Sequence, residues 1–154
     1  MHKNNLKAPA FSLTDTNGEQ VSLDQLLNKK KCVVLLFFPL AFSSVCTKEL
    51  CSVRDNLKIY NSLNAEIAGI SVDSFFTLKA FKEAQNLNYN LLSDFNKEVS
   101  EKLGVLNKDY YGMKGVSKRA VFVINREGRI IYSEILEDAG KLPDMYKVQE
   151  VLTD

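Results

Sequence analysis

The sequence predicts an α/β fold in which helices flank a central mixed β-sheet. Residues 32–38 (Cys-Val-Val-Leu-Leu-Phe-Phe) are apolar without interruption, which is typical of a short strand covered on both faces. Between residues 44 and 64, apolar side chains recur every three or four positions, as they do along one side of an amphipathic helix. A second apolar run at residues 65–72 predicts another buried strand. A strand, a helix and a second strand in this order indicate a sheet with helices packed on its faces.

A hairpin is expected before this core. Residues 8–13 alternate apolar and polar side chains, residues 16–19 (Thr-Asn-Gly-Glu) are a turn signal, and residues 20–23 resume the alternation. Ser22 can cap a short helix at residues 23–28. We therefore expect an N-terminal β-hairpin at the edge of the sheet, followed directly by one short helix.

The second half of the chain is expected to complete the sheet and cover it. Ser74 or Thr77 can cap the helix that follows the second buried strand. We expect helices at 78–85, 98–103 and 144–152, and strands at 91–94, 119–125 and 129–135. No repeat, low-complexity segment or linker interrupts the chain, so residues 1–154 are expected to form a single domain. A thioredoxin-like architecture matches this order of elements best.

The composition argues against several classes of function. Apolar residues make up 45% and charged residues 25%, as in ordinary soluble domains. The sequence has twenty Lys and Arg and nineteen Asp and Glu, and the formal net charge is +1. This balance gives no excess of positive charge that would attract nucleic acid or an anionic membrane. Residues 1–11 lack the apolar run of a signal peptide, and residues 32–39 are too few to span a bilayer. We expect a cytoplasmic protein with neither of these partners.

The chain has three cysteines, Cys32, Cys46 and Cys51, an odd number that does not make a disulfide framework. In a reducing compartment they are core residues, metal ligands or reactive thiols. A zinc site needs paired Cys and His at short spacing, and the single histidine, His2, stands apart near the N-terminus. The sequence also lacks a Cys-x-x-Cys pair, a histidine placed for a Cys–His hydrolase and a glycine-rich phosphate loop. We therefore expect no metal and no cofactor.

Cys46 stands at a position that favours a reactive thiol. The buried strand ends at Pro39, a short loop follows, and Cys46 falls in the first turn of the next helix. The unpaired N–H groups and the positive end of the helix dipole stabilise an anion there, so part of such a thiol exists as thiolate, the form that attacks the O–O bond of a peroxide. The alternative is a cysteine that only packs in the core. Ser43 can hydrogen-bond the sulfur and a bound peroxide, or it can be an ordinary helix cap.

The spacing Pro39-x-x-x-Ser43-x-x-Cys46 resembles the active-site pattern Pro-x-x-x-Thr/Ser-x-x-Cys of the peroxiredoxins, the AhpC/TSA superfamily. The string at residues 37–50 is most similar to the one-Cys AhpE-like or bacterioferritin-comigratory-type branch. Further similar strings, at 69–74, 91–94 and 119–125, extend the resemblance over nearly the whole chain. Serine stands at position 43 where threonine is more frequent, which keeps the hydroxyl but loses the methyl group that restricts its rotamer.

The resemblance implies a role for each residue of this motif. Cys46 corresponds to the peroxidatic nucleophile, Pro39 shields its sulfur from water, and Ser43 hydrogen-bonds the peroxide under attack. Arg119, at the start of its strand, corresponds to the family arginine that holds the thiolate and polarises the substrate. An adjacent guanidinium favours an anion and orients oxygens through its planar fork, so the physical chemistry agrees with this role.

Two further residues have open assignments. Glu49 matches a recurrent acidic position of the family, but it can equally pair with Arg54 or Lys48. Cys51 is a candidate resolving cysteine, because some bacterioferritin-comigratory-type members place one five residues after the nucleophile. On a helix of ~3.6 residues per turn these two side chains point about 140° apart, and a disulfide needs Cα atoms within ~7 Å, so the helix would have to unwind. The alternative is that Cys51 only packs, as we expect of Cys32.

The function that the resemblance implies is thiol-dependent reduction of hydrogen peroxide and organic hydroperoxides. Cys46 becomes a sulfenic acid and is recycled by an external thiol or dithiol, such as a thioredoxin-like or glutaredoxin-like protein. A redox sensor or thiol relay on the same scaffold is the alternative, and a non-catalytic interaction protein is a third. Related proteins often pair through loops near the active site, so a homodimer through residues 40–42 and 110–111, or a monomer, is expected rather than a ring.

Overall fold

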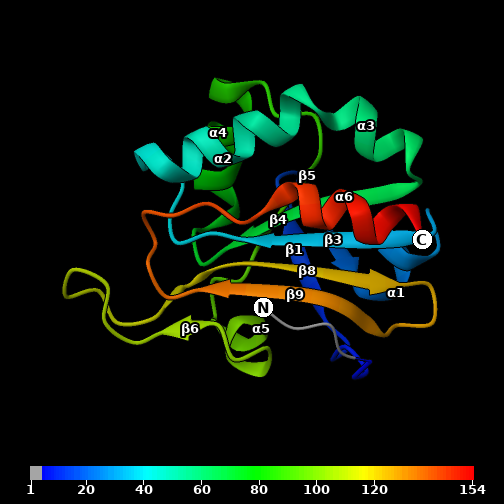
Figure 1. The fold of residues 1–154 in the computed structure, drawn as a ribbon. Helices are drawn as coiled ribbons and strands as arrows, with labels where there is room; N and C mark the ends of the chain where they lie inside the picture. The colour runs from blue at the N-terminus through cyan, green and yellow to red at the C-terminus, as the bar shows by residue number, and fades with distance from the viewer. Residues whose placement is uncertain (1–4) are drawn as a thin grey trace.

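The computed structural model describes residues 5–154, which form a seven-stranded mixed sheet in the order β2-β1-β5-β4-β3-β8-β9 (Figure 1). His2 lies outside the described residues. The strands of the sheet are β1 (Ser12–Asp15), β2 (Gln20–Ser22), β3 (Cys32–Phe37), β4 (Ala65–Ser71), β5 (Asn90–Ser93), β8 (Arg119–Asn125) and β9 (Ile130–Leu136). β3, β4 and β5 are parallel, and β8, β9, β1 and β2 each run antiparallel to a neighbour. The predicted mixed sheet with an edge hairpin is confirmed.

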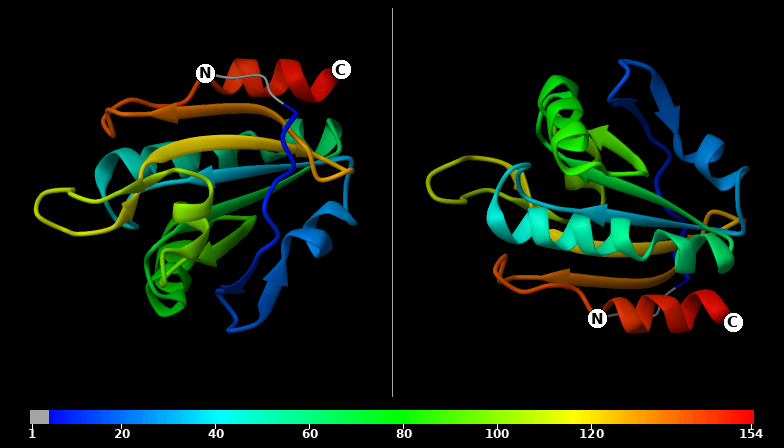
Figure 2. Two further views of the ribbon diagram at one scale, coloured as in Figure 1. Left: turned by 90° about the horizontal axis from the view of Figure 1, so that it is seen from below. Right: turned by 90° about the horizontal axis from the view of Figure 1, so that it is seen from above.

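Helices cover both faces of this sheet (Figure 2). They are α1 (Leu23–Leu27), α2 (Ser44–Asp55), α3 (Leu57–Ser62), α4 (Phe75–Gln85), α5 (Glu98–Lys102) and α6 (Met145–Thr153). Buried side chains of α2, α3, α4 and α6 join one core, and those of α1 and α5 join the other. Ser22 caps α1 in a capping box with Gln25, and Ser74 caps α4 by accepting from the Thr77 N–H, so Ser74 is the cap among the two predicted candidates.

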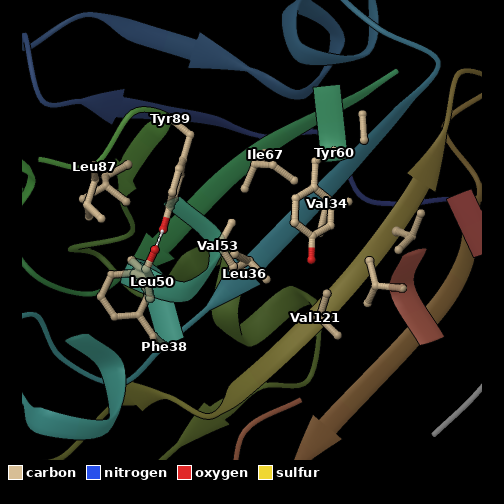
Figure 3. Close-up of a cluster of buried hydrophobic side chains, with 14 of the residues drawn as sticks. Val34, Leu36, Phe38, Leu50, Val53, Tyr60, Ile67, Leu87, Tyr89 and Val121 are labelled. Atoms are coloured by element: carbon tan, nitrogen blue, oxygen red, sulfur yellow. Dashed lines mark hydrogen bonds between the residues drawn. The ribbon is translucent and has the colours of Figure 1, made fainter. Parts of the chain in front are cut away.

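The strand β3 lies between these two cores, which explains its unbroken apolar sequence. All six of its residues are buried. Val33, Leu35 and Phe37 pack toward α1 and α5, whereas the alternate residues Val34 and Leu36 pack toward α2. Figure 3 shows the α2 side of this arrangement, where Leu50 and Val53 pack against the β3 side chains. The side chains of β3 and α2 are thereby packed against each other in one core.

The prediction of one continuous helix over residues 44–64 was wrong, because the chain breaks at Asn56. Its backbone lies at φ −108° and ψ 13°, outside helical geometry, and it ends α2 before α3 begins. The Asn56 side-chain amide donates to the Ser52 carbonyl at 2.9 Å, beside the Asn56 backbone N–H, which donates to the same carbonyl at 3.2 Å. The apolar spacing survives the break, since Tyr60 of α3 is still buried in the same core as Val53 of α2.

A second difference is a small two-stranded sheet that the sequence did not predict, formed by β6 (Leu106–Asn107) and β7 (Val116–Ser117). These strands have two residues each, too few for a periodic pattern to be visible. They frame the loop that carries Tyr110 and Tyr111, which extends to one side of the sheet in Figure 1.

Candidate active site

A tethered loop delivers Cys46 from β3 to the start of α2. The Phe38 N–H donates to the Ile70 carbonyl at 3.0 Å, so pairing with β4 continues one residue past β3. Pro39 is buried and follows directly. The Ala41 N–H then donates to Asp73 Oδ2 at 2.7 Å, which ties the loop to the carboxyl end of β4. Cys46 is therefore positioned by two neighbouring parallel strands and not by a free loop.

Cys46 lies in the first turn of α2, as predicted, and its side chain is only 1% exposed. Arg119 Nη2 donates to its Sγ at 3.2 Å. The sheet register explains the contact, because β8 runs antiparallel to β3 and its second residue pairs with the last residue of β3. Arg119, the first residue of β8, therefore lies beside the point where the chain leaves β3 for α2. A guanidinium and the N-terminus of a helix both favour a negative charge on this sulfur.

The guanidinium of Arg119 is fixed by two other groups. Nη1 donates to Glu49 Oε1 at 2.7 Å, in an ion pair whose side chains are 1% and 2% exposed. Nε and Nη2 donate to the Ala139 carbonyl oxygen at 3.1 and 2.9 Å. The planar fork thus has its orientation set before any substrate arrives, which is the preorganisation that stabilises developing charge.

Glu49 pairs with Arg119 rather than with Arg54 or Lys48, the two alternatives that its neighbours in sequence suggested. Arg54 instead pairs with Asp55 at 2.9 Å. Burial raises the pKa of Glu49 from 4.5 to about 7, although the charge of Arg119 and its hydrogen bond act in the opposite direction. Its second oxygen, Oε2, is buried and has no hydrogen-bond partner among residues 5–154.

Ser43 is the N-cap residue of α2, but its hydroxyl makes no capping hydrogen bond. The hydroxyl donates to the Leu40 carbonyl at 2.7 Å, and so helps to close the loop on itself. With its proton committed there, the oxygen still has lone pairs that can accept a hydrogen bond. The ordinary side-chain cap, one of the two alternatives for this serine, is therefore not what the structure contains.

A hollow of about 390 Å³ opens beside this cluster. Ser43, Val45, Tyr110, Arg119 and Ala139 are among its lining residues. Burial, followed by the nearby Cys46, raises the pKa of the Tyr110 hydroxyl. The hollow has room for a small substrate next to Arg119, the residue that donates to the Cys46 sulfur.

The other two thiols lie apart from this cluster. Cys51 is partly buried in α2, and its Sγ donates to Gln85 Oε1 at 3.5 Å. Cys32 is buried in the core at the start of β3, as expected, and burial raises the pKa of its thiol. Both Cys46 and Cys51 lie within the helical range of α2.

Sequence reasoning missed two contributors to the site, Asp73 and Ala139, and it placed Tyr110 only in a dimer loop near the active site. Asp73 accepts from both Ala41 and the Ser71 hydroxyl, and it follows β4 at the sheet edge where polar side chains commonly converge. Its place after an apolar strand was the signal available in the sequence. Ala139 acts only through its backbone carbonyl, which no side-chain pattern can reveal.

Within residues 5–154, no three His, Cys, Asp or Glu side chains gather as a metal site would require. Among the helices of the same range, none has the length and apolar character needed to cross a membrane.

Comparison with known proteins gives consistent matches. A model of the AhpC/TSA family matches residues 5–133. A protein of Coxiella burnetii named as a peroxiredoxin, bcp, is 40% identical over 127 residues, which are 80% of this chain and 82% of that protein. The crystal structure of the peroxidoxin BcpB from Mycobacterium tuberculosis superimposes with a TM-score of 0.87 at 30% identity, covering 99% of this chain and 97% of that one. The structure of Enterococcus faecalis AhpC has a TM-score of 0.84 at 29% identity and covers 99% and 91%.

Proposed function

Because the chain belongs to the AhpC/TSA family and is a thiol-dependent peroxidase acting on peroxides, we propose that Cys46 is the thiol that attacks the substrate. The observation that carries this proposal is the 3.2 Å contact between Cys46 Sγ and a guanidinium already fixed by Glu49 and Ala139. Neither Cys32 nor Cys51 has an arginine in hydrogen-bond contact with its sulfur in the described part of the chain.

The proposed step is a displacement on the peroxide oxygen. The Cys46 thiolate attacks one oxygen of ROOH, an S–O bond forms and the O–O bond breaks, and the alkoxide that leaves takes up a proton to become ROH. Arg119 holds the thiolate and then the oxygens that gain charge. Ser43 accepts a hydrogen bond from the peroxide hydroxyl, since its own proton is given to Leu40. Pro39, buried before the loop, shields the sulfur from water.

An external reductant of the thioredoxin-like or glutaredoxin-like class completes the cycle. One of its thiols attacks the sulfenic acid of Cys46, which gives a mixed disulfide and water, and its second thiol releases the reduced enzyme. An internal disulfide with Cys51 is the alternative resolution, and it requires the first turns of α2 to unwind. We prefer the external route because Cys51 is engaged with Gln85 of the neighbouring α4. A cytoplasmic location belongs to this proposal, since reduced dithiol proteins are available there.

Trapping the oxidised sulfur tests the assignment. The reduced protein is treated with one equivalent of peroxide in the presence of a sulfenic-acid-specific dione, and digested peptides are analysed by mass spectrometry. We expect the adduct on Cys46, and the same adduct in a Cys51→Ser control. An adduct on Cys32 or Cys51 instead would overturn the proposal, and a Cys46–Cys51 disulfide in place of the adduct would favour internal resolution.

We also propose a homodimer that uses the loops beside the active site. Phe42 is 53% exposed and Tyr111 is 89% exposed, although both are large aromatic residues. Such side chains are enriched at protein interfaces. Sedimentation of the reduced protein should show a dimer that a Tyr111→Ser variant weakens, and a monomer at all concentrations would refute the proposal.

A further inference from the structure

The loop that leads from β3 into α2 contains a strained residue, Phe42. Its φ of +69° lies in the left-handed region, where the Cβ of an L-residue crowds the backbone. Asn64 and Asn86 also have positive φ, but asparagine tolerates this conformation, whereas a bulky aromatic residue rarely adopts it. The Phe42 ring is 53% exposed and meets Phe81 edge-on, with 5.1 Å between the ring centroids. A strained residue persists only where its surroundings hold it, so the contacts on either side of Phe42 must keep it in place.

The Asp73 carboxylate holds the residue before Phe42. The Ala41 N–H donates to Asp73 Oδ2 at 2.7 Å, a short hydrogen bond to a charged acceptor. The same oxygen accepts from the Ser71 hydroxyl at 2.6 Å, and Ser71 is fully buried in β4. The Asp73 carbonyl accepts from the Ser93 hydroxyl at 2.6 Å. Asp73 is therefore anchored to the ends of β4 and β5, and it fixes the loop from that side.

The residue after Phe42 belongs to the start of α2. The Ser43 carbonyl accepts from the Thr47 N–H at 2.9 Å and from the Thr47 hydroxyl at 2.8 Å, which closes the first turn around Cys46. Phe42 thus joins a loop fixed to β4 with the helical turn that carries the reactive sulfur. Arg119 is held from β8 and by a backbone carbonyl outside α2. A change of φ at Phe42 would therefore separate Cys46 Sγ from the guanidinium that donates to it at 3.2 Å.

We propose that Asp73 is a positioning residue for peroxide reduction, because its carboxylate holds Phe42 in the strained backbone conformation that brings Cys46 to Arg119. This role rests on the proposed function, in which Cys46 is the thiol that attacks peroxide. Without the carboxylate, Phe42 relaxes to a negative φ and the first turn of α2 moves away from the guanidinium. Glycine takes a positive φ at little cost, so the need for Asp73 depends on the residue at position 42. This dependence separates a positioning role from a general effect of Asp73 on stability.

A double-mutant cycle at positions 42 and 73 tests this role. Stopped-flow oxidation by peroxide is measured for the wild type, Asp73→Ala, Phe42→Gly and the double variant. We expect Asp73→Ala to lower the oxidation rate constant at least about tenfold in the wild-type chain and at most about threefold in the Phe42→Gly chain. Asp73→Asn keeps an oxygen that accepts from the Ala41 N–H, so it should oxidise at least about fivefold faster than Asp73→Ala.

Asp15→Ala is the matched control, because Asp15 Oδ1 accepts from the N–H groups of Asn17 and Glu19 at 2.8 and 3.0 Å. It removes comparable hydrogen bonds from the turn between β1 and β2, and two strands separate β1 from β3 in the sheet. The oxidation rate of this control should stay within about twofold of the wild type. Urea denaturation checks that each variant is folded. If Asp73→Ala is not, Ser71→Ala replaces it in the cycle, because it removes the hydroxyl that orients the carboxylate, and the same dependence on position 42 is expected.

Two outcomes would overturn the role of Asp73. One is a loss in the wild-type chain that is less than about threefold greater than the loss in the Phe42→Gly chain. The other is an Asp73→Asn variant that oxidises as slowly as Asp73→Ala.

The Cys46 thiolate at neutral pH gives a second readout that needs no peroxide. It is measured as the ultraviolet thiolate absorbance that each variant loses when Cys46→Ser is added. The thiolate fraction should fall in Asp73→Ala and return in the double variant, because the sulfur regains its cation. If Cys46 were not the peroxidatic thiol, this pattern would persist while the oxidation rates did not follow it. If Asp73 did not position Cys46, the thiolate fraction would not depend on position 42.

Discussion

Replacing Arg119 by methionine removes the only charged donor that contacts the Cys46 sulfur in the described chain while keeping much of the buried volume. At the observed 3.2 Å, Coulomb's law with an effective dielectric constant of about 20 gives about 5 kcal/mol for a full ion pair, an upper limit. Removal of one preorganised donor from an active site costs about 3–4 kcal/mol in rate. We therefore expect the rate constant for oxidation of the variant by peroxide to fall about 10²- to 10³-fold.

The same substitution affects stability by a separate route, because it leaves Glu49 buried without its partner. Breaking a buried pair from one side costs about 3–5 kcal/mol, less what protonation of the carboxyl recovers. The double variant Arg119→Met with Glu49→Gln removes the buried charge as well. It should recover most of the free energy of unfolding and none of the oxidation rate, because the sulfur still lacks its cation.

Urea denaturation and stopped-flow oxidation of the same samples separate the two effects. The reasoning is refuted if Arg119→Met oxidises within about threefold of the wild-type rate. It is also refuted if the double variant regains that rate, because the loss would then come from the unpaired carboxyl and not from the missing guanidinium.

Three other predictions concern the surroundings of the site. The pKa of Glu49 is raised from 4.5 to about 7, so the folded state holds this proton more tightly than the unfolded state. The contribution of Glu49 to the free energy of unfolding is therefore full below pH 4.5. As the pH rises through 7, about 3 kcal/mol of that free energy is lost. Glu49→Gln should flatten this dependence in denaturation curves at several pH values, and an unchanged slope would contradict the cause given. Tyr89→Phe should lower the free energy of unfolding, measured by urea denaturation, by about 1–3 kcal/mol. The reason is that the buried Leu50 carbonyl loses the hydroxyl that donates to it at 2.7 Å (Figure 3). An unchanged free energy of unfolding would show that water replaces this donor. Cys51→Ser should oxidise with peroxide at the wild-type rate and turn over with an external dithiol, whereas loss of turnover would identify Cys51 as the resolver of Cys46.

Local patterns were enough to predict most of the fold. The apolar run of β3 predicted a strand between two cores, because every one of its side chains is buried and each position therefore carries an apolar residue. The break at Asn56 does not change the spacing of apolar residues in the sequence. It involves the backbone of one residue, Asn56, while the apolar spacing on both sides stays in phase.

The candidate site was less accessible from local patterns. Cys46 could be placed at a helix start from the preceding strand and loop, because those elements are adjacent in sequence. Arg119 lies 73 residues away, and its contact depends on the antiparallel register of β8 against β3. Without the family resemblance it would have been one charged residue at a strand edge. Glu49 was noticed, but its partner was not, because neighbours in sequence suggested Arg54 and Lys48 while the fold brings in Arg119.

Single-turnover stopped-flow oxidation of the reduced protein shows whether Cys46 is the thiol that reacts with peroxide. We expect a rate constant at least about 10³-fold above that of free cysteine at the same pH, which corresponds to about 4 kcal/mol of barrier lowering. We also expect that Cys46→Ser abolishes this reaction and that Cys51→Ser and Cys32→Ser do not. A wild-type rate no faster than free cysteine, or a fast rate that survives in Cys46→Ser, would contradict this assignment.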